Sequence, residues 1–311
     1  MLDITPITPD FVAEVRGLDL RQALPASLFA EVEAALNRYA VLVLPGQAVN
    51  EAQQLAFARC FGPLEVSLGP SLYNAGRPRR LDDAGLSDIS NLDETGDLLG
   101  KQDLRRLINL SNQLWHTDSS FKRTPASVSI LSAQEVVREG GETEFADMRA
   151  AWDALPPQQQ ARLEELVAEH DYFHSRALTG FDAISVPDEW KQRMPPVPQK
   201  LVRVHPGSGR KSLYLASHIK RLYGLDDAAS RALLDELMSF ATLPRFVHQH
   251  HWHVDDVVIW DNRCTMHRGR PFDESQRRAM RRATVMDSAP TVPENWRAPA
   301  ASSHTRAAQD A

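Results

Sequence analysis

The stretch DVVIWDNRCTMHR (residues 256–268) starts with a turn residue, continues as an apolar run and ends close to a histidine. A short apolar run bounded by turn residues is typical of a strand that is buried on both faces. Strand patterns also lie on either side of it in the chain, at RFVHQHHWHV (245–254) and RRAMRRATVMD (277–287). Three successive strand patterns predict that this part of the chain contributes to a β-sheet core.

Further strand patterns lie upstream of this region. They are VLVLPG (41–46), ISNL (89–92), LINLSNQLWH (107–116), ASVSILSAQEV (126–136) and a hairpin, KLVRVHPGSGRKSLYL (200–215), with Pro-Gly-Ser-Gly as its turn. Short strands at both ends of a helical middle favour a β-sandwich or jelly roll decorated by helices. We therefore expect an α+β fold with a jelly-roll core and flanking helices.

Helical patterns separate these strands. They cover residues 25–40, 50–62, 148–170 and 226–242. In the second of them, Asn50 and Gln53 stand at the two positions of a capping box, and Gly62 is expected to end the helix. The third is expected to form two helices, broken at Pro156-Pro157.

The arrangement of these elements predicts one domain, residues 1–288. Residues 67–107 contain clusters of Gly, Pro, Asp and Arg without a core pattern. A segment of this length without such a pattern is usually disordered or functional, and we expect an active-site lid. The tail, residues 289–311, is rich in Pro, Ala and Ser and is expected to be flexible.

The composition excludes several classes of protein. The 311 residues carry a net charge of −6, which argues against a nucleic-acid partner but not against a small anionic substrate. Two cysteines, Cys60 and Cys264, provide no disulfide framework and fit a reducing compartment. The start, MLDITPITPD, lacks the pattern of a secretory signal, and YAVLVLPG is too short to span a bilayer. We expect a cytoplasmic protein without a membrane partner, and leave open whether it forms a homo-oligomer.

The stretch QLWHTDSSF (113–121) places a histidine and an aspartate two positions apart. Side chains at positions i and i+2 of an extended segment point to the same side, so His116 and Asp118 could share one metal ion. Any polar strand end offers the same geometry. A third protein ligand is needed before the pair indicates a metal site.

Two regions contain candidates for this third ligand. The cluster VHQHHWHVDD (247–256) has many histidines, but it lacks a carboxylate at a suitable spacing, so hydrogen-bonded or solvated histidines are the better interpretation. His267 ends an apolar strand and is followed by turn residues. Cys264 lies three residues before it, where a buried inert thiol is a simpler interpretation than a nucleophile.

Several motifs, in order, resemble one family. They are VLVLPGQ (41–47), AFARCFGPLE (56–65), NQLWHTDSSF (112–121), GGETEFADMRAAWDALP (140–156), VRVHPGSGRKSLY (202–214), VVIWDNRCTMHRGRPFD (257–273) and RRAMRRATVMD (277–287). Together they resemble the Fe(II)/2-oxoglutarate-dependent dioxygenases of the taurine dioxygenase and 2,4-dichlorophenoxyacetate dioxygenase family. The resemblance covers most of residues 10–287 and implies a double-stranded β-helix, which agrees with the jelly roll expected above.

The resemblance also implies the metal and its ligands, which would be His116, Asp118 and His267. Two imidazoles and one carboxylate on one face suit Fe(II) and leave three coordination positions open. In the family, 2-oxoglutarate occupies two of these positions and O2 the third. A tetrahedral zinc site would lack that room.

Further residues match positions with known roles in the family. For 2-oxoglutarate these are Thr143, Trp260 and Arg278, whose guanidinium can bind a carboxylate in a bidentate manner. For the substrate they are Asn112 and His205. From the residues alone, Thr143 could equally be an ordinary β-branched strand residue, Asn112 and Trp260 packed strand residues, and His205 a turn histidine.

The spacing of two arginines suggests a division of roles. In a strand, Arg278 and Arg282 share one face, with about 13 Å between their α-carbons at ~3.3 Å per residue. This separation favours two different anions over joint binding of one carboxylate. Arg278 would hold 2-oxoglutarate and Arg282 the acidic group of the substrate, although Arg282 could also be a partly exposed strand residue. The sequence leaves open how the returning chain brings Arg278 level with His267.

The expected activity is hydroxylation of a small carboxylate substrate. The sequence around each motif resembles the aryloxyacetate-cleaving members most. This resemblance implies ether cleavage to a phenol and glyoxylate with release of succinate and CO2. The alternatives are a dioxygenase for taurine-like alkanesulfonates, a metal-dependent hydrolase on the same three ligands, and a non-catalytic jelly-roll binding protein. The segment 67–107 is the least matched part, so the resemblance says least about the substrate.

Overall fold

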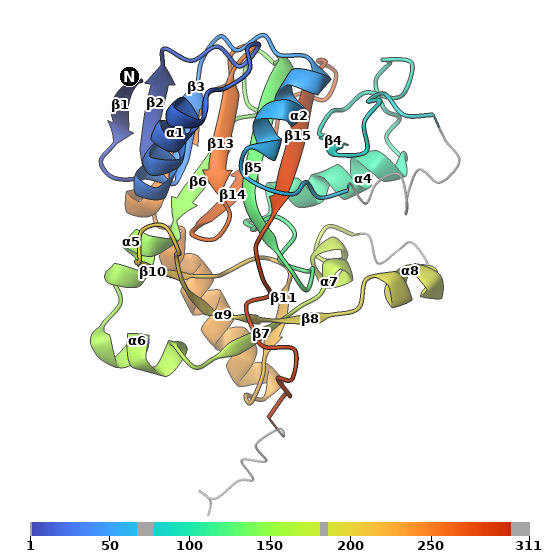
Figure 1. The fold of residues 1–311 in the computed structure, drawn as a ribbon. Coiled ribbons are helices and arrows are strands. Elements are labelled where there is room, and N and C mark those ends of the chain that lie inside the picture. The colour runs from blue at the N-terminus through green and yellow to red at the C-terminus, as the bar shows by residue number, and fades with distance from the viewer. Residues whose placement is uncertain (1, 67–77, 181–185, 300–311) are drawn as a thin grey trace, which may run out of the picture.

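Two β-sheets face each other in the computed structural model, which describes residues 2–66, 78–180 and 186–299 (Figure 1). The large sheet has seven strands in the spatial order β1-β2-β3-β13-β5-β15-β4. Its strands are β1 Asp3–Thr8, β2 Val12–Arg16, β3 Val41–Leu44, β4 Leu86–Asp88, β5 Ala126–Glu135, β13 Val257–Asp261 and β15 Ala279–Met286. Neighbouring strands are antiparallel except for β2 and β3, which are parallel.

The facing sheet is smaller and has the order β12-β6-β14. Its strands are β6 Thr143–Asp147, β12 Val247–His250 and β14 Thr265–Gly269. Two further small sheets lie below the first two, with the strands β7 Val167–His170, β8 Val197–Lys200, β9 Val202–Val204, β10 Lys211–Leu213 and β11 Ile219–Leu222.

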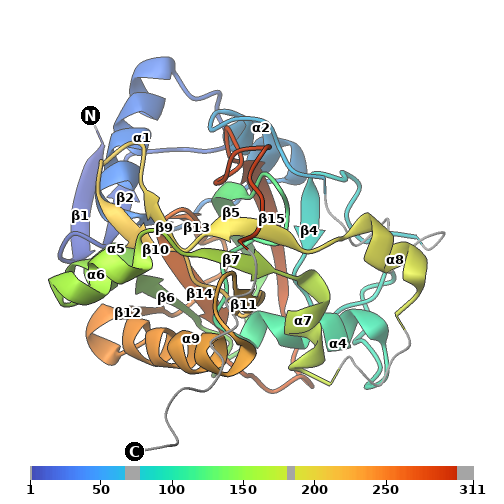
Figure 2. The same cartoon turned by 90° about the horizontal axis from the view of Figure 1, so that it is seen from below.

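Helices cover the outer faces of both facing sheets (Figures 1 and 2). The α-helices are α1 Ala26–Tyr39, α2 Glu51–Arg59, α4 Leu104–Leu110, α5 Met148–Asp153, α6 Pro157–Leu163, α7 Tyr172–Ala177, α8 Asp188–Arg193 and α9 Asp227–Ala241. Helices α1 and α2 lie on the large sheet, and α5 and α9 pack on the side of the small one. Short 3-10 helices follow α4 and α9, at η1 Ser111–Gln113 and η3 Pro244–Phe246. Among the described residues, no helix combines the length and the apolar character needed to cross a membrane.

Strand β13 shows how the opening stretch of sequence builds these layers. Val257 and Ile259 pack under α1 and α2, whereas Val258 and Trp260 point into the layer between the two sheets. The side chains alternate because successive residues of a strand face opposite sides of the sheet. Both faces are covered, which explains why this strand is apolar at every one of these positions.

Most of the helix predictions are confirmed. Asn50 and Gln53 form both hydrogen bonds of the capping box at the start of α2. Asp226 caps α9 by accepting a hydrogen bond from the backbone of Ala229. The hairpin predicted at 200–215 is also present, as β9 and β10.

Other local predictions are wrong. Residues 107–116, expected to be a strand, belong mainly to α4 and η1, because Asp103 caps a helix in which apolar residues recur at helical spacing. The strand expected at 89–92 occurs at 86–88 as β4, and the end of the region 148–170 forms β7 instead of a helix. The strand expected at 245–254 is reduced to β12.

The first part of the predicted tail makes contacts with the rest of the protein. Val292 is buried, and the guanidinium of Arg123 donates hydrogen bonds to the carbonyls of Val292 and Pro293. Thr291 donates from its hydroxyl to Gln199 on β8. The flexibility expected for residues 289–311 stays a prediction, and residues 300–311 lie outside the described part of the chain.

Candidate metal centre and adjoining cavities

His116, Asp118 and His267 come together where a loop joins the edge of the small sheet. The backbone of His116 pairs with that of His267 on β14 through hydrogen bonds of 3.0 and 2.8 Å. The Nε2 atoms of the two imidazoles each lie 3.7 Å from an oxygen of Asp118. One ligand atom from each of the three residues lies within 4.8 Å of the other two, so the residues can share one ion.

The protonation states of this cluster suit a divalent metal. The three side chains are buried, and burial is the main cause that lowers the pKa of both imidazoles and keeps them neutral. Burial also opposes the charge of Asp118, but Arg282 and, after it, the two neighbouring histidines outweigh burial and hold the pKa of Asp118 at about 2. His116 donates from Nδ1 to the carbonyl of Leu114 over 2.7 Å, which leaves the lone pair of Nε2 free for a metal.

A buried network that sequence reasoning missed holds Asp118 in place. Ser129 on β5 donates to Oδ2 of Asp118 over 2.7 Å. Asn262 donates to Ser129 and accepts from the backbone N–H of Asp118 and from the indole of Trp260. Trp260 also packs against His267, with 4.6 Å between ring centroids. The motif WDNR contains Asn262 and its partner Trp260, but Ser129 and Asp118 are distant from it in the sequence.

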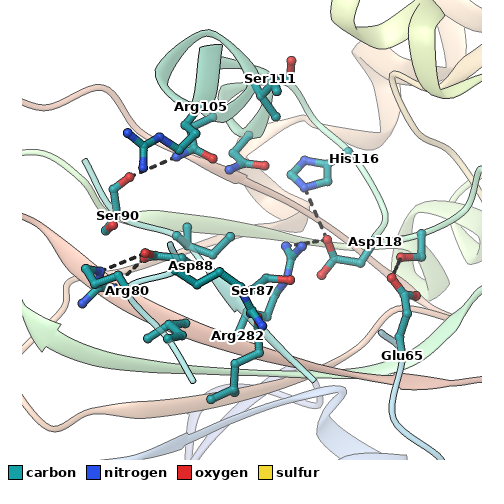
Figure 3. Close-up of a pocket in the computed structure, with 18 of the residues that line it drawn as sticks. Glu65, Arg80, Ser87, Asp88, Ser90, Arg105, Ser111, His116, Asp118 and Arg282 are labelled. Atoms are coloured by element: carbon teal, nitrogen blue, oxygen red, sulfur yellow. Dashed lines mark hydrogen bonds and ion pairs between the residues drawn. The ribbon is translucent and has the colours of Figure 1, made fainter. Parts of the chain in front are cut away.

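Arg282 links the cluster to a large cavity. Its Nη1 donates to Oδ1 of Asp118 over 2.6 Å, and Figure 3 shows the guanidinium pointing toward this carboxylate. Strand β15, which carries Arg282, belongs to the large sheet, whereas His267 lies on the facing sheet. The chain therefore crosses between the sheets after His267, which answers the question that the sequence left open.

Two cavities meet at this cluster, and both are lined by Asn112, His116 and Arg282. Cavity A lies between the two sheets, and its further lining includes Leu131, Thr143, Trp260, His267, Phe272 and Arg278. Cavity B lies beside β4 and α4, and its further lining includes Arg80, Arg105, Phe121, Tyr172, Arg176 and His218. Cavity B encloses about 1220 Å³, including its opening to solvent.

Cavity A contains a buried cation, Arg278, which has no acidic partner in the part of the chain that the structure describes. Arg278 donates from Nη2 to the carbonyl of Gly141 over 3.1 Å. No carboxylate of the described residues lies within ion-pair distance of it. Burial lowers the pKa of its guanidinium to about 10, which still leaves it charged at neutral pH. An uncompensated buried cation of this kind is suited to an anionic ligand.

Thr143 lies in the same cavity with its hydroxyl oriented by a neighbour. Its Oγ1 accepts a hydrogen bond of 3.0 Å from the indole N–H of Trp252. An indole N–H can only donate, so the hydroxyl proton of Thr143 remains available for another acceptor. Arg278 and Thr143 therefore both present donors to cavity A.

His205 is placed differently from the other predicted residues. It lines neither cavity; its Nε2 bonds to Asp261 at 2.8 Å, and its Nδ1 lies 3.0 Å from the backbone N–H of Ser208. Asp261 is also held by Arg263. The substrate contact predicted for His205 does not fit this position, because the imidazole is enclosed in a structural network.

The remaining histidine and cysteine candidates form no convincing second site. His251 and His253 are exposed, beyond the end of β12. His205, Asp261 and Cys264 lie close together, but the carboxylate is already paired with Arg263. Burial raises the pKa of the Cys264 thiol, which makes it inert.

Comparison with known proteins agrees with this geometry. The family model described as taurine catabolism dioxygenase TauD, TfdA family matches residues 3–284. An α-ketoglutarate-dependent 2,4-dichlorophenoxyacetate dioxygenase of Cupriavidus pinatubonensis is 47% identical over 285 residues, which are 91% of this chain and 97% of that protein. An (S)-phenoxypropionate/α-ketoglutarate-dioxygenase of Sphingobium herbicidovorans is 36% identical over 284 residues, 89% of this chain and 92% of that protein.

A solved structure is similar over nearly the whole chain. The crystal structure of AAD-2 in complex with Mn(II) and N-oxalylglycine superimposes with a TM-score of 0.86 at 46% identity, and covers 94% of this chain and 100% of that one. The chain therefore belongs to the TauD/TfdA family and has the mixed helix-and-sheet fold of its dioxygenases. It is a 2-oxoglutarate-dependent dioxygenase that acts on a small molecule, and its cofactors are Fe(II), 2-oxoglutarate and O2.

Proposed function

We propose that the chain cleaves aryloxyacetates of the 2,4-dichlorophenoxyacetate kind. The observation that carries this proposal is the position of Arg282, which lines cavity B and is hydrogen bonded to Asp118. An acid bound there would lie beside the proposed metal ligands, and its aryl ring could pack on Phe121 and Tyr172. The similarity to 2,4-dichlorophenoxyacetate dioxygenases supports the same substrate class.

Every predicted residue except His205 has a role in this proposal. His116, Asp118 and His267 would bind Fe(II), because they offer two neutral nitrogens and one anionic oxygen from one side. In cavity A, Arg278 and Thr143 would hold the distal carboxylate of 2-oxoglutarate. Trp260 would orient His267. Asn112 would contact the substrate where the two cavities meet, and Arg282 would bind the acidic group of the substrate.

The products follow from the carbon that is attacked. The bound iron and 2-oxoglutarate supply the oxidation, in which O2 is consumed and 2-oxoglutarate becomes succinate and CO2. Hydroxylation of the carbon between the ether oxygen and the carboxylate gives a hemiacetal, which breaks into a phenol and glyoxylate. This chain's contribution is to orient that carbon through Arg282 and to exclude water from the buried triad.

We also propose that the two facing sheets are the walls of a double-stranded β-helix, and that residues 1–288 form one domain. Residues 78–107, the described part of the predicted lid, contribute Arg79, Arg80 and Arg105 to the lining of cavity B, which supports a role in closing it. The other part of that lid, residues 67–77, lies outside the described residues. The low cysteine content supports action in the cytoplasm.

The proposed function is tested by the products. Purified protein with Fe(II), 2-oxoglutarate and O2 should release succinate, phenol and glyoxylate in equal amounts when phenoxyacetate or 2,4-dichlorophenoxyacetate is added. Taurine should stimulate succinate release little. Succinate release that responds to taurine and not to the aryloxyacetates would overturn the proposal, and phenol release without O2 would instead point to a hydrolase.

A further inference from the structure

Cavity B holds a second arginine close to the triad, Arg176 on α7. We propose that Arg176 binds the acidic group of the substrate together with Arg282, and that its charge makes the enzyme selective for anionic over neutral aryl ethers. This inference rests on the proposed function, whose substrate is an aryl ether carrying a carboxylate.

Among the described residues, Arg176 has no counterion. Its Nη1 donates to the hydroxyl of Ser175 over 2.9 Å, and its Cζ lies 4.2 Å from the ring centroid of Tyr172. Its Nε is buried and has no hydrogen-bond partner. Among the described residues, no carboxylate lies within ion-pair distance of this guanidinium.

The other cations of cavity B are committed to protein groups. Arg282 forms an ion pair with Asp118, with 2.6 Å between Nη1 and Oδ1. This pair is close to neutral, so Arg282 can supply hydrogen-bond donors but little net attraction for an anion. Arg80 pairs with Asp88, and Arg105 pairs with Asp103 and Glu94. Nη2 of Arg79 donates to the carbonyls of Asp83 and Leu86, although Arg79 has no acidic partner among the described residues.

The groups beside Arg176 fit an aryl acid. Phe121 and Tyr172 stack edge to face with 4.8 Å between centroids, and Phe121 makes the same kind of contact with His218. These rings form an apolar wall next to the guanidinium within one cavity. A ligand with an aromatic ring and a carboxylate can use both features, whereas a neutral aryl ether can use only the rings.

The test is a calorimetric titration of ligands into the enzyme loaded with Fe(II) and 2-oxoglutarate in the absence of O2. We expect Arg176→Gln to weaken phenoxyacetate binding about 10- to 100-fold, the usual effect of losing a charge-assisted contact. Arg176→Lys should recover much of the affinity because it keeps the charge. Phenoxyacetamide, which has the same shape without the charge, should bind wild type and Arg176→Gln equally.

Controls separate this role from a structural one. The dissociation constant for 2-oxoglutarate should be the same in Arg176→Gln and in wild type. Lys191→Gln removes an exposed cation on the neighbouring helix α8 and should change neither ligand's affinity. Wild-type affinity for phenoxyacetate in Arg176→Gln would overturn the proposal, and so would an equal loss of affinity for phenoxyacetamide.

The failure of the proposed function would look different. If wild type binds phenoxyacetate but releases no phenol when O2 is admitted, the proposed reaction is wrong, while the affinity comparison still decides the role of Arg176. If wild type does not bind phenoxyacetate, both proposals are overturned.

Discussion

Arg282 donates from Nη1 to Oδ1 of Asp118 over 2.6 Å, so one guanidinium touches a proposed metal ligand and lines both cavities. Ser129 bonds to the other oxygen of the same carboxylate. Asp118 is therefore fixed from two sides before any metal binds. Because of this contact, a change at Arg282 should affect both the substrate site and the metal site.

Replacing any proposed ligand should abolish the reaction. His116→Ala, Asp118→Ala and His267→Ala each remove one of three protein ligands, and the cluster offers no fourth within its 4.8 Å spacing among the described residues. We expect no detectable succinate release and weak Fe(II) binding in an anaerobic titration. A variant that keeps near-normal turnover with iron would mean that the triad is wrongly assigned.

The two arginines should differ in the ligand that they affect. Arg278→Ala should raise the KM for 2-oxoglutarate most, because it removes the uncompensated cation of cavity A. Arg282→Ala should raise the KM for the aryloxyacetate and also weaken Fe(II) binding, because it releases Asp118. Truncating a buried charged contact costs ~2–5 kcal/mol, so each change in KM should exceed about tenfold. Steady-state kinetics with each substrate varied in turn gives both KM values for each variant. If both variants changed the two KM values alike, this division of roles would be wrong.

The network behind Asp118 should tune metal affinity. Ser129→Ala removes the hydrogen bond to Oδ2, and Asn262→Ala removes the contact to the backbone of Asp118. Groups that orient a metal ligand typically change affinity or activity by ~10–100-fold. We expect calorimetry to show that each variant binds Fe(II) more weakly by this factor. An unchanged affinity for Fe(II) would contradict the role of the network.

Trp252 should act on 2-oxoglutarate through Thr143. Trp252→Phe keeps the aromatic ring but removes the donor that occupies Oγ1 of Thr143, so the hydroxyl loses its orientation. We expect a several-fold rise in the dissociation constant of 2-oxoglutarate. In a Thr143→Ala background the same substitution should have no further effect. Additive losses in this double-mutant cycle would show that Trp252 acts in another way.

The stability of the protein should depend on pH through His170. Burial lowers the pKa of this histidine to about 3, whereas in the unfolded chain it is near ~6.5. Between these values only the unfolded chain takes up the proton, so the free energy of unfolding falls as pH decreases below ~6.5, by up to ~1.4 kcal/mol per pH unit for this group. Urea unfolding at pH 7.5 and 5.5 should show a smaller decrease in His170→Gln. An equal decrease in both proteins would contradict this.

Features that depend on neighbouring residues could be read from the sequence. The capping box of Asn50 and Gln53 needs only residues three apart, and His116 and Asp118 stand two positions apart in the sequence. The ordered motifs also allowed the family, and His267 as the third metal ligand, to be predicted from the sequence. Local reading failed at residues 107–116, where an apolar pattern compatible with a strand forms a helix capped by Asp103.

Only the tertiary structure decided the contacts between distant strands. Ser129 and Asn262 are 133 residues apart, and nothing in either local pattern marks their bond or their joint hold on Asp118. Arg176 stands on a short helix with no motif, and the role proposed for it follows from its place in cavity B, where no acid of the described residues pairs with it. Short-range hydrogen bonds and side-chain periodicity act within a few residues, whereas the partner of a buried charge is set by how the whole chain folds.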